Sequence, residues 1–335
     1  MVGTVESEKK IDNIDSEVLS STTKASGKLK EDLKYLGKIS VLRSLFHISF
    51  TWIQLSLLIS ACIYFDSIPL LLLGILLIGA RQYGLLILLH DASHGLLHPK
   101  RHLNDSLALW LIAAPCGSSF VNSRSTHLMH HRFLGHLKRD PDYFLYSSGE
   151  PVPKQNFKQV LSHFGKLLFG GQIVHTFFGN MRARSEGLSK DIYLKLKALI
   201  PVVMMQGLVF YIFLIFDQPL EYLYLWVLPL VSVAVLLNGI RVFCDHSVPV
   251  GSSADPELLL ISYQSNPVEI FFLSPFHMNY HAEHHFFPFV PHYNLPKLRA
   301  LLKQNPDYWN RITWRSSYFA YMAAYLLPKR YVKPA

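Results

Sequence analysis

The sequence has few charged residues and few cysteines. Only 16% of its 335 residues are charged and 50% are hydrophobic, whereas a soluble globular protein usually carries about 25% charged residues. The cysteines Cys62, Cys116 and Cys244 are scattered along the chain. Their scattered placement excludes a disulfide framework or a zinc ribbon. The three cysteines are predicted to act as small hydrophobic side chains in a reducing setting. The composition therefore favours a membrane protein.

The N-terminal region has no long hydrophobic run. Residues 1–44 are predicted to be a polar tail that can include an interfacial helix near its end. Because no apolar stretch precedes residue 45, a cleavable signal peptide is not expected. The first membrane span would then serve as its own insertion signal.

Four long hydrophobic runs follow, at about residues 45–65, 70–89, 198–216 and 223–243. A membrane-spanning helix needs about 20 apolar residues, so each run is long enough to cross a bilayer. Arg81 and Gln82 interrupt the second run and must find partners or reach the interface. Short turns join the runs in pairs, which predicts an all-α integral membrane protein with four transmembrane helices in two hairpins. Residues 107–114 are too short to span and are interpreted as an interfacial helix.

Lys and Arg are absent from the two short turns, residues 66–69 and 217–222, although the chain has 32 basic residues and a net charge of +9. By the positive-inside rule, both termini and the polar blocks between the hairpins face the cytosol. The basic charge is thereby explained without a nucleic-acid partner. We expect a membrane domain over residues 45–305, with a cytosolic histidine-rich cap made by residues 90–195 and 245–305. Residues 306–335 are predicted to be an amphipathic C-terminal tail.

Histidine is abundant, with 17 residues, and eight of these lie in three blocks. The first block, His90-Asp-Ala-Ser-His94, places two imidazoles one turn apart on one helix face. The second and third blocks repeat an HxxHH spacing that lets three rings converge. Their histidines are His127, His130 and His131, and His281, His284 and His285. All three blocks lie on the same predicted side of the membrane, so their imidazoles can converge. Histidines in these spacings predict a metal site.

The number of imidazoles bears on the number of metals. A catalytic zinc ion takes about three protein ligands, whereas the blocks supply eight imidazoles, or nine with the isolated His246. Eight or nine imidazoles suit two metal ions that each keep a coordination position open for oxygen. Imidazole binds several metals, but a site that meets hydrocarbon needs oxygen activated at a redox metal, which favours iron. The alternative is a membrane zinc protease, since the first block is similar to HExxH. Asp91 is shorter than the required Glu, however, and the HxxHH blocks would have no role.

The order of these blocks and the four-span layout resemble the membrane fatty acid desaturase family, which includes hydroxylases and carotenoid ketolases. The resemblance covers roughly residues 45–305. It is tightest in three motifs: Leu89-His-Asp-Ala-Ser-His-Gly95; Thr126-His-Leu-Met-His-His-Arg132 with Asp140-Pro-Asp142; and Asn279-Tyr-His-Ala-Glu-His-His-Phe-Phe-Pro288 with Val290-Pro-His-Tyr-Asn-Leu-Pro296. His246 closes Arg241-Val-Phe-Cys-Asp-His246, which is similar to an element of bacterial-type members.

The resemblance implies an iron pair held by nine histidines: His90, His94, His127, His130, His131, His246, His281, His284 and His285. His277 competes with His246 for the ninth place. The implied reaction is the oxygen-dependent removal of two hydrogens from adjacent methylenes of a fatty acyl or other lipid. Electrons would come from an external ferredoxin or small cytochrome, with O2 as co-substrate. Hydroxylation or ketolation of a lipid or carotenoid is the alternative.

Carboxylates beside the ligands are candidates to orient them, because a ligating imidazole usually donates its other N–H to a carboxylate or carbonyl. These are Asp91, Asp245 and Glu283. His98 and His102 are interpreted as interfacial, because Pro99 should end or kink the helix that carries His90 and His94. The remaining histidines, His47, His136, His163, His175 and His292, are assigned no role. The substrate and the metal that each histidine binds stay open.

Overall fold

The computed structural model describes residues 27–147, 157–169, 192–247 and 260–326, and these are mostly helical. Among them, four helices are long and apolar enough to cross a membrane. They are α3 (Val41–Phe65), α4 (Ile68–Ser93), the segment Lys197–Ile215 of α10 (Ile192–Ile215), and the continuous helical segment Tyr222–His246. The four predicted runs overlap these helices.

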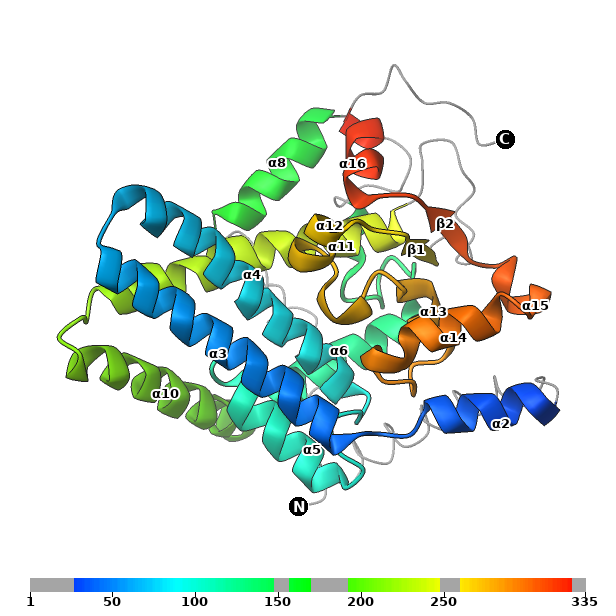
Figure 1. Ribbon diagram of the computed structural model, residues 1–335, viewed down its shortest axis with the longest axis horizontal. Helices are drawn as coiled ribbons and strands as arrows, with labels where there is room; N and C mark the ends of the chain where they lie inside the picture. Colours follow the sequence, from blue (N-terminus) through cyan, green and yellow to red (C-terminus); the bar gives the residue numbers. More distant parts are fainter. Residues whose placement is uncertain (1–26, 148–156, 170–191, 248–259, 327–335) are drawn as a thin grey trace.

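The first two spans are joined by a very short turn. The side chain of Ser40 caps the start of α3 by accepting a hydrogen bond from the backbone N–H of Arg43. The helix ends at Asp66, which adopts a left-handed conformation with φ of 39°. Pro69 lies in the first turn of α4, where its missing N–H leaves no helical hydrogen bond unmade. The chain therefore reverses at once, and α3 packs along α4 (Figure 1).

Burial differs sharply among the spans. Only 22% of the most apolar window of α3 and 11% of that of α10 are buried against the rest of the protein, compared with 56% for α4. Apolar side chains that no protein packs against are expected to face hydrocarbon in a membrane protein. Thus α3 and α10 form the outside of the membrane part, and α4 runs through its centre.

The fourth span is irregular in its first half. It begins with two π-helical stretches, η3 (Tyr222–Val227) and η4 (Leu230–Ala234), and continues as α11 (Val235–His246). π-Helical turns are rare and occur frequently near functional sites. The η4 stretch lies very close to α4, since a Cβ atom on Gly79 would be 2.5 Å from the Cβ of Val233. A glycine at this position therefore permits the contact between the second and fourth spans.

The polar pair in the middle of the second span has partners. The side-chain amide of Gln82 donates to the backbone carbonyl of Trp226, at 2.9 Å. The Arg81 guanidinium donates to the carbonyl of Phe271, at 2.6 Å, and lies 3.7 Å from the centroid of the same residue's ring. Polar groups at membrane depth require such partners because hydrocarbon offers none.

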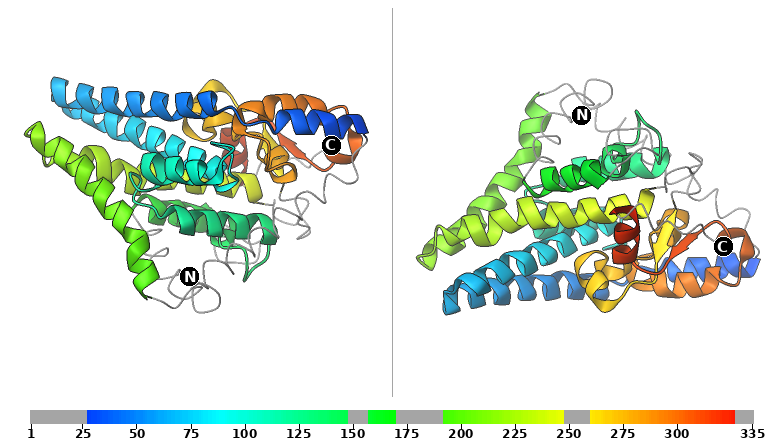
Figure 2. Two further views of the ribbon diagram at one scale, coloured as in Figure 1. Left: turned by 90° about the horizontal axis from the view of Figure 1, so that it is seen from below. Right: turned by 90° about the horizontal axis from the view of Figure 1, so that it is seen from above.

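The remaining elements surround one end of the spans (Figures 1 and 2). Figure 2 shows α13 to α15 at the end of the molecule opposite the turn between α3 and α4. The elements outside the spans are α2 (Gly27–Leu36), α5 (Arg101–Ala108), η2 (Leu109–Ala113), α6 (Phe120–Phe133), α7 (Tyr143–Ser147), α8 (Phe157–Leu168), β1 (Ile261–Tyr263), α12 (Pro267–Phe272), η6 (Pro275–His277), α13 (His281–Phe286), η7 (His292–Asn294), α14 (Leu295–Leu302), α15 (Pro306–Trp309), β2 (Thr313–Arg315) and α16 (Tyr318–Leu326).

A small sheet departs from the expected all-helical fold. Strands β1 and β2 pair in parallel, with Ile261 opposite Thr313 and Tyr263 opposite Arg315. Each strand has only three residues, which is too short for an alternating hydrophobic pattern to be recognised. The prediction of a wholly helical chain is therefore wrong at this pair.

The sheet leads into a helix that packs against the fourth span. The ring of Tyr318, at the start of α16, is fully buried and stacks on Tyr263 with the ring centroids 3.8 Å apart. Its hydroxyl donates to the Asp245 carboxylate at 3.0 Å. Part of the predicted C-terminal tail thus supports the end of α11, where His246 lies.

Replacing Tyr318 with Phe should lower the melting temperature of the purified protein. The change removes a donor to a buried carboxylate, and leaving a buried polar group without its partner costs about 1–3 kcal/mol. Tyr35→Phe is the matched control, because the Tyr35 side chain is 64% exposed. Differential scanning fluorimetry in detergent measures both variants. Equal melting temperatures would contradict a supporting role for this contact.

Candidate metal centre

Four helices deliver the candidate ligands to one place. Two histidines lie at the end of α4, three in the last two turns of α6, one at the end of α11 and three on α13. A spacing of three or four residues puts histidines of one helix on a common face. The nine histidines brought together are His90, His94, His127, His130, His131, His246, His281, His284 and His285.

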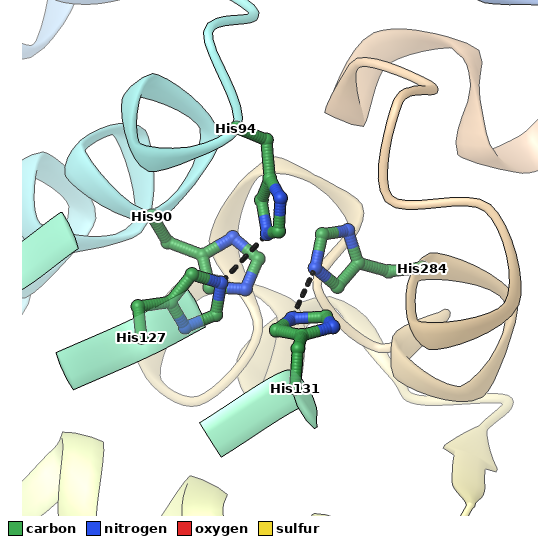
Figure 3. Close-up of side chains that lie close together, drawn as sticks. All are labelled: His90, His94, His127, His131 and His284. Atoms are coloured by element: carbon green, nitrogen blue, oxygen red, sulfur yellow. Dashed lines mark hydrogen bonds between the residues drawn. The ribbon is translucent and has the colours of Figure 1, made fainter. Parts of the chain in front are cut away.

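The nine histidines form two groups. The five-histidine group comprises His90, His94, His127, His131 and His284, and one nitrogen from each lies within 4.8 Å of all the others. Figure 3 shows the rings pointing toward a common centre from α4, α6 and α13. The Nε2 atoms of His94 and His127 are 2.7 Å apart, and those of His131 and His284 are 3.1 Å apart.

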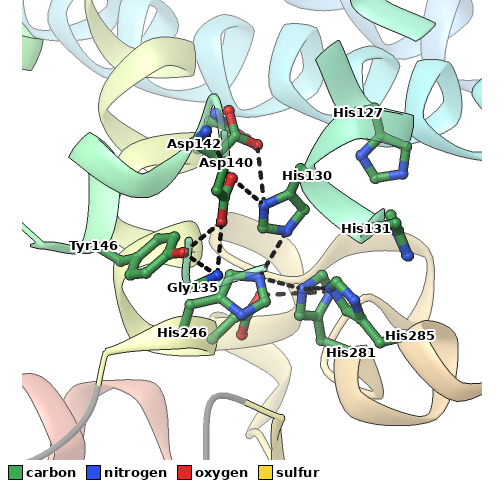
Figure 4. A network of polar contacts seen from close by, with 12 residues as sticks. His127, His130, His131, Gly135, Asp140, Asp142, Tyr146, His246, His281 and His285 are labelled. Atoms are coloured by element: carbon green, nitrogen blue, oxygen red, sulfur yellow. Dashed lines mark hydrogen bonds and ion pairs between the residues drawn. The ribbon is translucent and has the colours of Figure 1, made fainter. Parts of the chain in front are cut away.

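The four-histidine group comprises His130, His246, His281 and His285 and meets the same 4.8 Å limit. The Nε2 atom of His246 lies 3.1 Å from that of His130 and 2.9 Å from that of His281. The Nε2 atom of His285 is 3.0 Å from that of His281. Figure 4 shows these rings between α6, α11 and α13.

The two groups are neighbours. The consecutive residues His130 and His131 belong to different groups, and so do His284 and His285. The rings of His131 and His285 stack with their centroids 4.1 Å apart. A cavity beside them is lined from both groups, by His90, His127, His130, His246 and His281, together with Asp142, Arg241 and Val242. Ions held by the two groups would therefore face a common space.

Burial keeps most of these imidazoles neutral. Desolvation, followed by the neighbouring His90, lowers the pKa of His94 to about 3. Desolvation and nearby imidazoles likewise hold the pKa values of other ligands well below their usual range; these are His127, His131, His281, His284 and His285. A neutral imidazole has a free lone pair, which is the form that binds a metal.

The donor set fits transition-metal ions. Both ring nitrogens of His90 are buried and have no hydrogen-bond partner among the described residues. Burying a polar atom in this way costs about 1–3 kcal/mol, and a bound metal would satisfy one of these two nitrogens. Neither group of described side chains includes a carboxylate or a thiolate. An all-imidazole set suits Fe, Cu, Ni or Zn, whereas Mg and Ca prefer oxygen ligands.

A carboxylate orients one ligand of the four-histidine group. The Nδ1–H of His130 donates to Asp140 at 2.9 Å (Figure 4). Asp140 also accepts hydrogen bonds from the Tyr146 hydroxyl, at 2.5 Å, and from the Gly135 backbone N–H, at 3.1 Å. Burial disfavours charge on His130, but its bond to Asp140 and the charges of Asp142 and Asp140 outweigh this and raise its pKa. The sequence motif contained Asp140, but its role was missed because ten residues separate it from His130.

Asp91 serves a different partner from the expected one. Its carboxylate lies 3.9 Å from Nδ1 of His90, too far for a hydrogen bond. Instead it accepts from the ring Nδ1–H of His292 at 2.6 Å and from the backbone N–H of His292 at 3.0 Å. The other ring nitrogen of His292 lies 2.6 Å from Nδ1 of His47. Both histidines were assigned no role, yet they link α3, α4 and the segment after α13.

The other two expected carboxylates also have stronger partners elsewhere. Asp245 is 3.8 Å from Nδ1 of His281, but it is closer to Arg241, at 3.2 Å. Glu283 accepts a hydrogen bond from the Ser262 hydroxyl at 2.5 Å, and no described histidine donates to it. Desolvation raises the pKa of Glu283 to about 7. Direct hydrogen bonding to a ligand histidine is therefore observed at Asp140 rather than at these residues.

The remaining histidines lie outside both groups. His277 has φ of 62° and stacks beside Tyr280, with the ring centroids 6.1 Å apart. The rings of His98 and His136 each accept a hydrogen bond from the backbone N–H two residues later. His102 is exposed and His163 lies on α8. His175 lies outside the described residues.

The fold and the site together define a class: a helical protein with membrane-spanning helices and two adjacent all-histidine groups suited to metals. A family model described as "Fatty acid desaturase" matches residues 67–318. This protein belongs to that family, and its relatives indicate an oxidoreductase.

Three relatives, each less than 30% identical to this chain, differ in their named activities. The chain is 26% identical over 251 residues to "Dihydrorhizobitoxine desaturase" of Bradyrhizobium elkanii, covering 70% of this chain and 68% of that protein. It is 28% identical over 221 residues to "Beta-carotene ketolase" of Paracoccus sp. (strain PC1), covering 64% and 74% of the two chains. It is 23% identical over 252 residues to "Beta-carotene 4-ketolase" of Protosiphon botryoides, covering 72% and 55%.

Single replacements should remove metal from one group at a time. His94→Ala takes a ligand from the five-histidine group and His246→Ala from the four-histidine group. Each variant is expected to lose about half of the bound metal, and the double variant nearly all of it. Mass spectrometry for metals on protein loaded with ferrous iron measures this. His136→Ala is the control, because that exposed ring belongs to neither group; equal loss in the control would contradict the assignment.

Asp140→Asn should weaken metal binding without removing a ligand. Loss of a carboxylate that orients a ligating imidazole typically costs 10- to 100-fold in metal affinity, and we expect about that loss. Asp142→Asn is the matched control, since its carboxylate lies 3.9 Å from Nδ1 of His130 and forms no hydrogen bond with it. Competition with a metal chelator measures the affinity. Similar losses in both variants would point to a general charge effect.

Proposed function

We propose that this protein is an oxygen-dependent fatty acyl desaturase in which nine histidines hold two iron ions. The observation that carries the proposal is the division of nine convergent histidines into two adjacent groups, beside the ends of the second and fourth membrane-spanning helices. The substrate is a fatty acyl chain or a related lipid. The reaction removes two hydrogens from adjacent methylenes, with O2 as co-substrate and electrons from an external donor.

The iron pair, when bound, would supply the oxygen activation that breaking an unactivated C–H bond requires. The protein's own residues hold and orient the ligands. The Asp140 carboxylate fixes the ring plane and the tautomer of His130. The contact between Asp91 and His292 ties the end of α4 to the segment that follows α13. Burial keeps most of the imidazoles neutral, with His130 as the exception.

The position of the new double bond would depend on how the protein positions the lipid chain relative to the metals. Adjacent methylenes of a lipid chain differ little in binding energy, so selectivity requires that one carbon pair be held near the metals. The side chain of Val242 lines the cavity next to both histidine groups and is a candidate contact for the lipid. The same residues can serve hydroxylation or ketolation, in which oxygen is added to the carbon.

Ketolation is a second candidate because two of the relatives above are named as β-carotene ketolases. The desaturase proposal rests on the family match and on the named desaturase relative. The zinc protease alternative has lost its support, since the chain belongs to the desaturase family. In addition, the carboxylate of Asp91 is engaged by His292 rather than free to act as a general base.

We also propose a topology of two hairpins, with both termini and the histidine groups on the cytosolic side. The two short turns contain no Lys or Arg and lie at the same end of the molecule in Figures 1 and 2. Helix α14, whose sequence includes Lys297 and Arg299, lies at the opposite end of the molecule. This distribution agrees with the positive-inside rule.

Lipid analysis after expression in a host of known acyl composition tests the proposal. The native protein should produce a new unsaturated fatty acid, and His130→Ala should produce none, because it removes a metal ligand. His136→Ala should retain the activity. A host that also supplies β-carotene separates the alternatives: an unchanged acyl profile together with a ketolated carotenoid would contradict the desaturase assignment.

A further inference from the structure

A basic surface lies beyond the histidine groups, on the side away from the membrane. We define the basic α14–α15 surface by Lys297, Arg299, Lys303 and Arg311. Three of these side chains are exposed and Arg299 is half-buried. Over residues 281–316 the acidic side chains are the buried Glu283 and the exposed Asp307. The surface therefore carries a net positive charge.

Three of the four basic side chains lack a carboxylate at ion-pair distance within the described part of the protein. Among the residues that the structure describes, Lys297, Arg299 and Lys303 form no ion pair with a carboxylate. A cluster of cations with a net positive charge raises the local concentration of negatively charged partners and speeds their association. The surface thus suits an acidic partner.

Aromatic rings lie beneath the cations. The guanidinium carbon of Arg299 is 4.1 Å from the centroid of the Trp314 ring, and the Lys303 ammonium is 5.5 Å from that of Trp309. The two indole rings are 4.6 Å apart. Cation–π contacts of this kind hold the long side chains in place. Tryptophan and arginine are also enriched where proteins meet one another.

The surface connects directly to ligand residues. The Arg299 guanidinium carbon lies 5.2 Å from the ring of Tyr280, which immediately precedes His281. The Arg311 guanidinium carbon lies 4.9 Å from the ring of Phe286, which immediately follows His285. Both of these histidines belong to the four-histidine group. A partner on this surface would therefore be separated from that group by little more than one layer of aromatic side chains.

The position favours a soluble partner over lipid headgroups. In Figure 2, α14 and α15 lie at the end of the molecule opposite the turn between α3 and α4. Residues on that side would project away from the bilayer if the four spans cross it. Anionic lipids attract basic residues only within about a Debye length of the membrane surface.

We propose that the basic α14–α15 surface is the docking site for an acidic, one-electron carrier protein that reduces the metal centre. The inference rests on the proposed function. Each desaturation consumes one O2, two electrons and two protons, and yields two waters together with the double bond. Two reduced carriers, each oxidised by one electron, supply the two electrons in succession.

Charge reversal at Lys297 and Lys303 tests this. Both side chains are exposed and lie outside the metal site. The double variant Lys297→Glu and Lys303→Glu should slow association of an acidic plant-type [2Fe–2S] ferredoxin by about tenfold or more at low salt. Added salt should shrink the difference. Surface plasmon resonance with metal-free full-length protein in nanodiscs measures binding independently of turnover.

A matched control and a second readout complete the design. Lys100→Glu reverses an exposed lysine between α4 and α5 and should bind ferredoxin normally. In iron-loaded protein, reoxidation of reduced ferredoxin should slow in the double variant, whereas turnover with dithionite should match the native protein.

The docking proposal would be overturned if the double variant bound ferredoxin at the native rate. It would also be overturned if Lys100→Glu slowed ferredoxin association as much as the double variant does. Weaker binding of the nanodiscs to anionic vesicles with unchanged ferredoxin binding would show a lipid-binding surface and would also overturn it. Failure of the proposed function is distinguishable. In that case ferredoxin binding would still depend on the two lysines, while no lipid product would form with any reductant.

Discussion

The convergence of buried, neutral imidazoles is the constraint on which the arrangement depends. Nine rings must meet although the helices that carry them are far apart in sequence. Burying so many polar rings is unfavourable unless their nitrogens are satisfied. Contacts next to the ligands hold the helix ends in position. Arg241 and Asp245 form an ion pair within α11, and the Tyr318 hydroxyl donates to Asp245, which joins α16 to the end of α11.

Much of this was accessible from sequence because the signals are local. Four hydrophobic runs predict four spans, and the histidine spacing places rings on common helix faces. Eight of the nine proposed ligands lie in histidine motifs within single helices, and His246 was assigned from the resemblance of Arg241-Val-Phe-Cys-Asp-His246 to an element of the family. Arg81 and Gln82 were correctly expected to need partners, which they find at Phe271 and Trp226.

Other features depend on contacts between distant segments, which no local pattern reveals. Asp91 and His292 are 201 residues apart, and the sequence neighbour of Asp91 was the wrong partner to expect. The short strands pair across about fifty residues, and Tyr318 reaches Asp245 from another part of the chain. The division of the histidines into two groups is also a tertiary property. Consecutive residues such as His130 and His131 contribute to different groups because their rings leave α6 in different directions.

The metal inventory of the native protein tests the central claim most directly. Protein purified after expression in iron-supplemented medium should contain about two irons per chain and little zinc. Mössbauer spectroscopy of the same sample should resolve two iron environments, because one group offers five imidazoles and the other four. One zinc ion per chain, with no iron, would contradict the account.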